Sequence, residues 1–175
     1  MIKSEIRKTM LSKRKEQSIE DKTIRNQDII KKIRNHPKYK EAQVVAIFYP
    51  MGDEINLLDL LNDHKTFLFP RVKGSMMDFY VYHKDMVFIR SNFGVLEPAQ
   101  TETIYQNEID LMIVPALAID QSLSRVGYGK GYYDKYISQH TISYTLGVIY
   151  DFQEVDDIEV TPMDQKLDAY IKGSL

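Results

Sequence analysis

The chain has 175 residues, 43% of them hydrophobic and 27% charged, which is an ordinary composition for a soluble globular protein. It contains no cysteine, which excludes disulfides and thiolate metal sites, and no apolar run long enough to span a membrane. With a formal net charge of −2 and this length, we expect one domain covering residues 1–175.

The first third of the chain has the periodicity of helices. Apolar residues recur at a spacing of three to four at Ile2, Ile6, Met10 and Leu11. Ser18, followed by Asp21, is a suitable N-cap for a second helix, whose apolar side carries Ile24, Ile29, Ile30 and Ile33. Pro37 disfavours helical geometry at His36 and should end this helix. The N-terminal segment has no apolar core, so it is not a secretory signal, and we expect a cytoplasmic protein.

From residue 43 onward the period changes to that of strands alternating with helices. Short apolar runs predict strands at 43–49, 66–70, 78–83, 111–115 and 142–150. Helices are predicted at 55–63 and 131–139. This alternation favours an α/β fold whose sheet is parallel in its centre.

The stretch "RVGYGKGYYD", from Arg125 to Asp134, carries three glycines at every second position. It follows a predicted strand and leads into a helix. Glycine permits backbone angles closed to other residues, so neighbouring N–H groups can converge on an anion, and the helix N-terminus adds its positive dipole end. Arg125 and Lys130 supply full positive charges. The stretch therefore favours phosphate binding.

Two familiar phosphate motifs do not fit this stretch. A Walker A loop would need glycine at Ser124 and Ser or Thr at Gly131, and a dinucleotide fingerprint would need glycine at Tyr132. The alternative is a glycine-rich turn that only starts a helix, with Tyr133, Tyr136 and Ile137 facing the core.

Three groups of acidic residues are candidates for a site, each with a structural alternative. Asp134 could hold Mg²⁺ beside a phosphate, or it could offset the helix dipole. Asp164 could also hold Mg²⁺. However, "TPMD" resembles a helix start with a capping box, and the pattern alone favours this structural role for Asp164. Asp53 and Glu54 follow the first strand, where ligands of α/β sheets bind, or they lie in a solvated loop before a helix.

Positive charge is concentrated in residues 1–40, which contain 13 Lys or Arg and 5 Asp or Glu, against 10 and 20 in the remainder. A balance of +8 against −10 predicts an anionic partner or charge-complementary packing of the two parts. Lys3, Arg7 and Arg14 share a helix face that could cover a phosphate. The same charges could form a solvated face or a nucleic-acid surface, although no nucleic-acid-binding motif is present. No nucleophile motif or histidine ligand spacing is present either.

The stretch "VPALAIDQSLSRVGYGKGYYDKYI" resembles the signature of the 5-formyltetrahydrofolate cyclo-ligase family, also called methenyltetrahydrofolate synthetase. "KSEIRK", "DEI" and "TPMDQKLDAYI" agree with the family in the same order, so the likeness covers essentially the whole chain. The departures are mild: Ala116, Ile119 and Val126 stand where the family usually has glycine, phenylalanine and leucine. None of them affects a charged residue.

The resemblance implies a Rossmann-like three-layer α/β sandwich with a mostly parallel central sheet and N-terminal helices. It implies ATP- and Mg²⁺-dependent cyclisation of 5-formyltetrahydrofolate to 5,10-methenyltetrahydrofolate, through a phosphorylated formyl intermediate and with release of ADP and phosphate. The matching ATP-binding positions are Lys3, Ser4, Glu5, Ile6, Arg7, Arg125, Val126, Gly127, Tyr128, Gly129, Lys130, Gly131, Tyr132 and Tyr133. Arg125 and Lys130 are the expected catalytic residues, Tyr49 and Glu54 the substrate contacts, and Asp134 and Asp164 the metal ligands.

The expected partners are therefore the folate and ATP, without nucleic acid or membrane. We expect a monomer, with a dimer as the alternative. Two other functions stay open from the residues alone. One is a nucleic-acid-binding module that uses the basic N-terminal segment, and the other is a Rossmann-like enzyme of sugar-phosphate or CoA metabolism.

Overall fold

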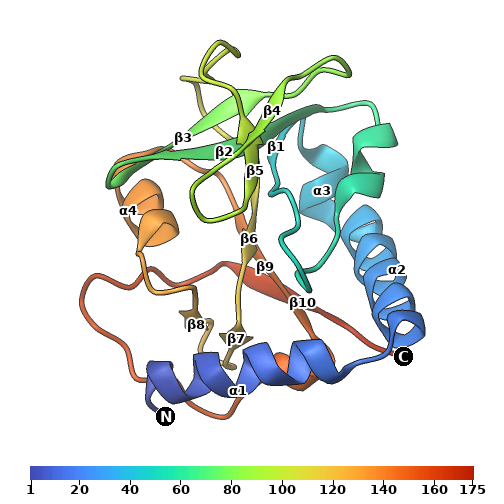
Figure 1. The fold of residues 1–175 in the computed structure, drawn as a ribbon, viewed down its shortest axis with the longest axis vertical. Helices are drawn as coiled ribbons and strands as arrows, with labels where there is room; N and C mark the ends of the chain where they lie inside the picture. The colour runs from blue at the N-terminus through green and yellow to red at the C-terminus, as the bar shows by residue number, and fades with distance from the viewer.

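A six-stranded sheet in the order β10-β9-β6-β1-β2-β3 runs through the centre of the computed structural model, which describes residues 1–175 (Figure 1). Its strands are β1 (Val44–Ala46), β2 (Thr66–Lys73), β3 (Met76–Val81), β6 (Leu111–Pro115), β9 (Thr145–Tyr150) and β10 (Ala169–Gly173). Five of the strands are parallel, and only β3 runs antiparallel, against β2. The mostly parallel α/β sheet expected from the sequence is confirmed.

The helices begin and end largely where the sequence predicts. They are α1 (Lys3–Glu16), α2 (Ile19–Asn35), α3 (Pro37–Glu41) and α4 (Tyr132–Gln139). The Ser18 hydroxyl accepts a hydrogen bond from the Asp21 N–H at 3.0 Å, so it caps α2 as expected. His36 is extended before Pro37, which ends α2 and occupies the first turn of α3.

Helices pack on both faces of the sheet and make a three-layer structure. Helix α2 packs against one face of the sheet through Ile29, Ile30 and Ile33. These side chains are buried among residues of the strands such as Val45, Phe67 and Ile113. Tyr136 of α4 packs on the opposite face with Met112 and Val114. Neighbouring residues of one strand point to opposite faces, so each strand contributes to both clusters.

Helix α1 stands apart from these layers and crosses below the hairpin formed by β7 (Ala118–Ile119) and β8 (Arg125–Val126) (Figure 1). Its residues Ile6 and Met10 form a third buried cluster with Leu117, Ala118, Val126 and Ile158. This small cluster holds the basic N-terminal helix against the rest of the protein. None of the helices has the length and apolar character needed to cross a membrane.

Several elements differ from the expectation. The helix predicted at 55–63 is only a 3₁₀ segment, η1 (Leu58–Asn62), which begins where the Asn56 side chain accepts the N–H of Leu58. The predicted strand at 43–49 is paired only over 44–46, and that at 66–70 continues to residue 73. Strand β10, the β7–β8 hairpin and the hairpin of β4 (Phe88–Arg90) and β5 (Leu96–Pro98) were not predicted.

The topology creates a crevice at one edge of the sheet. From β1 the chain proceeds to β2 and β3 on one side, and it later returns to β6, on the other side of β1, before β9 and β10. The connections that follow the carboxyl ends of β1 and β6 therefore lead in opposite directions. This makes the edge of the sheet between them a topological switch point. In open α/β sheets, ligands bind in such a crevice.

The contact between α2 and β10 depends on Gly173. A Cβ atom at this position would lie 2.5 Å from the backbone oxygen of Arg25 and 2.6 Å from the Ile29 side chain. The backbone of α2 cannot move locally, so we expect Gly173→Ala to lower the free energy of unfolding by about 1–3 kcal/mol. Urea unfolding measures this. Gly147→Ala is the matched control, because its Cβ would meet only side-chain atoms, the closest being the terminal methyl groups of Ile119 and Leu167, and it should cost less. A Gly173→Ala protein as stable as the wild type would contradict this packing.

Candidate active site

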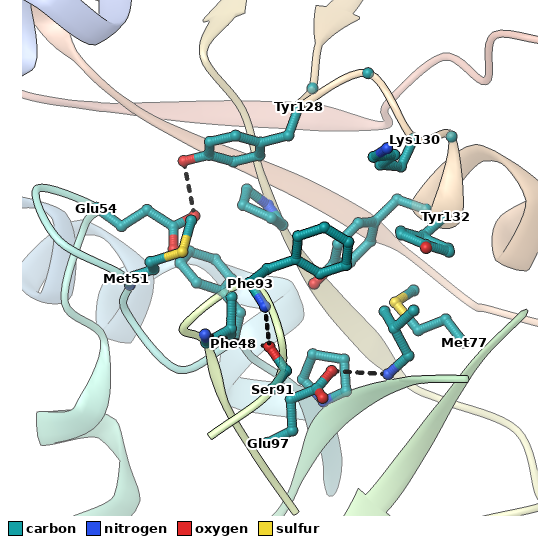
Figure 2. Close-up of a pocket in the computed structure, with 18 of the residues that line it drawn as sticks. Phe48, Met51, Glu54, Met77, Ser91, Phe93, Glu97, Tyr128, Lys130 and Tyr132 are labelled. Atoms are coloured by element: carbon teal, nitrogen blue, oxygen red, sulfur yellow. Dashed lines mark hydrogen bonds between the residues drawn. The ribbon is translucent and has the colours of Figure 1, made fainter. Parts of the chain in front are cut away.

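A cavity of about 840 Å³ opens at this switch point (Figure 2). Phe48 and Tyr49 enter it from the end of β1, and Pro115 from the end of β6. The wall opposite the glycine loop is formed by the β4–β5 hairpin and β2. The cavity brings together residues from the N-terminus, the middle and the C-terminus of the chain, including Lys3, Glu54, Lys130 and Asp164.

The glycine loop, residues 125–131, forms one side of the cavity. Gly129 and Gly131 have φ angles of +97° and +71°, a backbone region that favours glycine. Gly131 is the N-cap of α4 and provides no capping side chain, so the first N–H groups of that helix remain available for an anion. This agrees with the phosphate loop that the sequence favours.

Arg125 is a buried cation beside the loop. Its Nη1 donates to the Pro115 carbonyl at 3.1 Å, its Nη2 lies 3.9 Å from Oδ1 of Asp134, and its Nε has no partner. Burial lowers the pKa of the Arg125 guanidinium, and the charge of Asp134 opposes this. A guanidinium that is 9% exposed and so weakly paired is a strong position for an added anion.

Helix α1 adds two more cations from the other side of the loop. The Arg7 Nε donates to the carbonyl of Gly127 at 2.8 Å, and the Lys3 ammonium pairs with Asp164 at 2.5 Å. Both side chains line the cavity, whereas Arg14, the third cation of the predicted helix face, does not. Of the other predicted ATP contacts, Tyr128, Tyr132 and Tyr133 also line the cavity. Four lie elsewhere: Ser4 and Glu5 are exposed, whereas Ile6 and Val126 are buried in the apolar cluster under α1. These four do not line the cavity, and their contact with ATP stays a prediction.

The two predicted metal ligands line the same end of the cavity. Oδ1 of Asp134 accepts the backbone N–H of Gln165 at 3.1 Å, which fixes the segment that carries Asp164. The Asp164 carboxylate accepts the N–H of Thr161 at 2.8 Å, as in a capping box, but a turn forms there instead of the expected helix. Burial raises the pKa of Asp164, but hydrogen bonds from Lys3 and Thr161 outweigh it and hold this pKa below its usual value.

These carboxylates fit one kind of metal site. The structure has no group of three acidic or histidine side chains that could hold an ion alone. Mg²⁺ typically binds through one or two carboxylates together with phosphate oxygens, and two carboxylates that share a cavity with the glycine loop fit that kind of donor set.

Glu54 is a buried carboxylate at the other end of the cavity (Figure 2). Oε1 accepts the N–H of Met51 at 2.9 Å, and Oε2 accepts the hydroxyl of Tyr128 at 3.1 Å. Burial raises the pKa of Glu54, and these two hydrogen bonds and the charge of Arg14 only partly oppose it. The solvated-loop alternative for Glu54 is therefore wrong, whereas Asp53 is half-buried and outside the lining.

Sequence reasoning missed the wall formed by the β4–β5 hairpin. Phe93 is 70% exposed at its tip, and the Lys130 ammonium lies 5.8 Å from the centre of its ring. Glu97 is buried on the same hairpin and accepts the N–H of Val72 at 2.8 Å. The short paired segments of the hairpin have no clear period, so the sequence offers no signal for them.

A sequence model of the 5-formyltetrahydrofolate cyclo-ligase family matches residues 1–172. The chain belongs to this family. The 5-formyltetrahydrofolate cyclo-ligase of Mycoplasma genitalium is 32% identical over 179 residues, covering 97% of this chain and 96% of the relative. The protein of the same name from Mus musculus is 26% identical over 82% of this chain and 79% of its own length.

Two solved structures share the fold. The NMR structure of 5,10-methenyltetrahydrofolate synthetase from Aquifex aeolicus has a TM-score of 0.84 and 29% identity, covering 97% of this chain and 89% of that one. The 5,10-methenyltetrahydrofolate synthetase of Mycoplasma pneumoniae has a TM-score of 0.77 and 25% identity, covering 97% of both chains. Family membership confirms the resemblance seen in the signature, and with it an ATP-dependent ligase activity on a folate. It decides against the nucleic-acid module and the sugar-phosphate or CoA enzyme.

The buried charge of Arg125 leads to a prediction about stability and ATP binding. Replacing a poorly paired buried cation by an apolar side chain of similar length is often neutral or stabilising, so we expect ligand-free Arg125→Met to match the wild type or exceed it by about 1 kcal/mol. ATP should raise the melting temperature of the wild type but not that of the variant. Arg90→Met, outside the cavity, is the control and should keep the ATP effect. An unchanged ATP effect in Arg125→Met would contradict the anion site.

Proposed function

We propose that the two ends of this cavity hold the two substrates of 5-formyltetrahydrofolate cyclo-ligase. ATP places its phosphates on the glycine loop and the cations around it, and the folate binds between Glu54 and the β4–β5 hairpin. The observation that carries the proposal is the weakly paired Arg125 in the same cavity as the buried acceptor Glu54. One region attracts anions and the other attracts N–H donors, which matches a triphosphate and a pterin ring.

The reaction needs no protein nucleophile. The oxygen of the N5-formyl group attacks the γ-phosphorus of ATP, the bond to the β-phosphate oxygen breaks, and ADP leaves with the electron pair. N10 then attacks the activated formyl carbon and loses its proton, and the carbon–oxygen bond breaks to release phosphate. The products are 5,10-methenyltetrahydrofolate, ADP and phosphate. The protein must align these atoms and neutralise the developing charge.

The residues around the loop are suited to that task. Arg125 and Lys130 act as the catalytic cations that stabilise charge on the transferred phosphoryl group. Arg7 holds the loop through the carbonyl of Gly127, and Lys3 adds a charge at the open end. The glycine N–H groups supply donors that need no reorganisation during the reaction.

Asp134 and Asp164 are the residues that would hold Mg²⁺, which supplies charge neutralisation of the phosphate oxygens when it is bound. In the structure Lys3 already neutralises Asp164, and Arg125 faces Asp134. Both cations can therefore turn to the nucleotide once another positive charge balances the carboxylates.

At the folate end Glu54 would accept N–H donors of the pterin ring. Its two oxygens each receive one hydrogen bond from the protein, which leaves lone pairs for a ligand. The Tyr49 ring, packed 5.2 Å from that of Phe88, would contact the substrate beside it. We further expect one domain that acts as a monomer in the cytoplasm, which size-exclusion chromatography and fractionation can test.

Asp134→Asn tests the metal end. Removing the charge should lower the rate of ATP-dependent methenyl formation by about 100-fold or more, because phosphate charge is then poorly neutralised. Absorbance of the methenyl product measures this, with reactions lacking ATP or containing EDTA as blanks. Asp156→Asn replaces an exposed acid outside the cavity and should behave as the wild type. Normal turnover by Asp134→Asn would remove that residue from the metal site.

Glu54→Gln tests the folate end. We expect the KM for 5-formyltetrahydrofolate to rise about tenfold, because a charged acceptor is lost, while the KM for ATP changes little. Protonation removes the same acceptor, so the wild-type folate KM should also rise as pH falls, with a midpoint above the ordinary value of 4.5. This pH dependence should be absent in the variant. Equal weakening of both substrates would count against the assignment.

A further inference from the structure

Arg14 is a buried cation that the phosphate site does not use. It lies on α1, is 5% exposed, and is outside the lining of the cavity. It forms no ion pair, its Nε has no partner, and its Nη1 donates to the hydroxyl of Tyr128 at 2.9 Å. A buried guanidinium without a carboxylate partner costs stability, so its presence points to a role beyond packing.

The direction of the hydrogen bonds shows what Arg14 does. A guanidinium can only donate, so the Tyr128 oxygen accepts from Arg14 and its single proton must go elsewhere. That proton is donated to Oε2 of Glu54, at an O–O distance of 3.1 Å (Figure 2). Although the Tyr128 residue is 38% exposed, its hydroxyl is therefore held between two buried charged groups. Arg14 thus orients the Tyr128 hydroxyl so that it donates its proton to the Glu54 carboxylate.

The same tyrosine belongs to the glycine loop. Tyr128 lies between Gly127, whose carbonyl accepts from Arg7, and Gly129, whose φ angle is +97°. Two arginines of α1, Arg7 and Arg14, therefore donate hydrogen bonds to the consecutive loop residues Gly127 and Tyr128. Any shift of the loop backbone around a phosphate moves the Tyr128 hydroxyl relative to Glu54.

We infer that Arg14, acting through the Tyr128 hydroxyl on Glu54, couples the two ends of the cavity, so that nucleotide on the loop raises the affinity for folate. This inference rests on the proposed folate-binding role of Glu54. Arg14 is a positioning residue, because it touches neither substrate site directly. Linkage requires that the folate raise nucleotide affinity by the same factor.

The test is the ratio of the folate dissociation constants without and with an ATP analogue that cannot transfer its γ-phosphate, in the presence of Mg²⁺. In the wild type we expect a ratio of about 5 or more. Tyr128→Phe, which keeps the ring and removes the hydroxyl, should reduce the ratio to about 1, the value for two sites that are not coupled. Arg14→Met should do the same, and Arg14→Lys should restore part of the ratio, because an ammonium can also donate to the hydroxyl.

Tyr105→Phe is the matched control, because it removes a hydroxyl that donates to the Glu108 carbonyl at 2.8 Å, outside the cavity. It should keep the wild-type ratio. A wild-type ratio near 1, or a Tyr128→Phe ratio equal to that of the wild type, overturns the inference. If Arg14→Met does not fold, the hydroxyl deletion still decides.

Glu54→Gln separates the two claims. If it leaves folate binding without nucleotide unchanged, the proposed role of Glu54 fails, and the coupling fails with it. If it weakens folate binding while Tyr128→Phe keeps the full ratio, only the coupling through Arg14 and Tyr128 fails.

Discussion

Buried positive charge beside the glycine loop is the interaction on which this structure depends. Arg125 begins the loop and Arg14 contacts it through Tyr128; each is less than a tenth exposed, and neither is in close contact with a carboxylate. Removing a guanidinium from water is expensive unless a negative group compensates it. The packing of α1 and of the β7–β8 hairpin offsets that cost in the free protein, and in the proposed ATP complex a phosphate compensates the charge of Arg125.

The sheet topology explains why such distant residues meet. The chain leaves β1 in one direction and returns to β6 in the other, so the ends of these two strands are free to bind a ligand. Glu54 follows β1, and the glycine loop follows the hairpin after β6. Helix α1 and the segment around Asp164 close the site from outside the sheet. The crevice therefore carries cations such as Arg125 and Lys130 together with the buried carboxylate of Glu54.

The sequence predicted the parts of the site that rest on local chemistry. Alternating glycines between a strand and a helix indicated the loop that lines the cavity, and the period of α2 with its Ser18 cap placed that helix correctly. Asp164 could not be settled locally, since its capping-box contact with Thr161 forms without a helix and its charge is paired with Lys3, over 160 residues away. Arg14 was one of several equivalent-looking cations on α1, and only the tertiary contact with Tyr128 distinguishes it. The β4–β5 hairpin was missed because it is defined by the pairing of two short strands, and neither strand has a recognisable hydrophobic pattern.

Helix α1 joins the rest of the protein through a small apolar cluster of its own, apart from the clusters on the two faces of the sheet. It nevertheless carries Lys3, Arg7 and Arg14, which reach three different points of the cavity wall. The cavity is thus assembled from segments that lie far apart along the chain. A protease that cuts between α1 and α2 would therefore separate these three cations from the cavity while sparing the sheet.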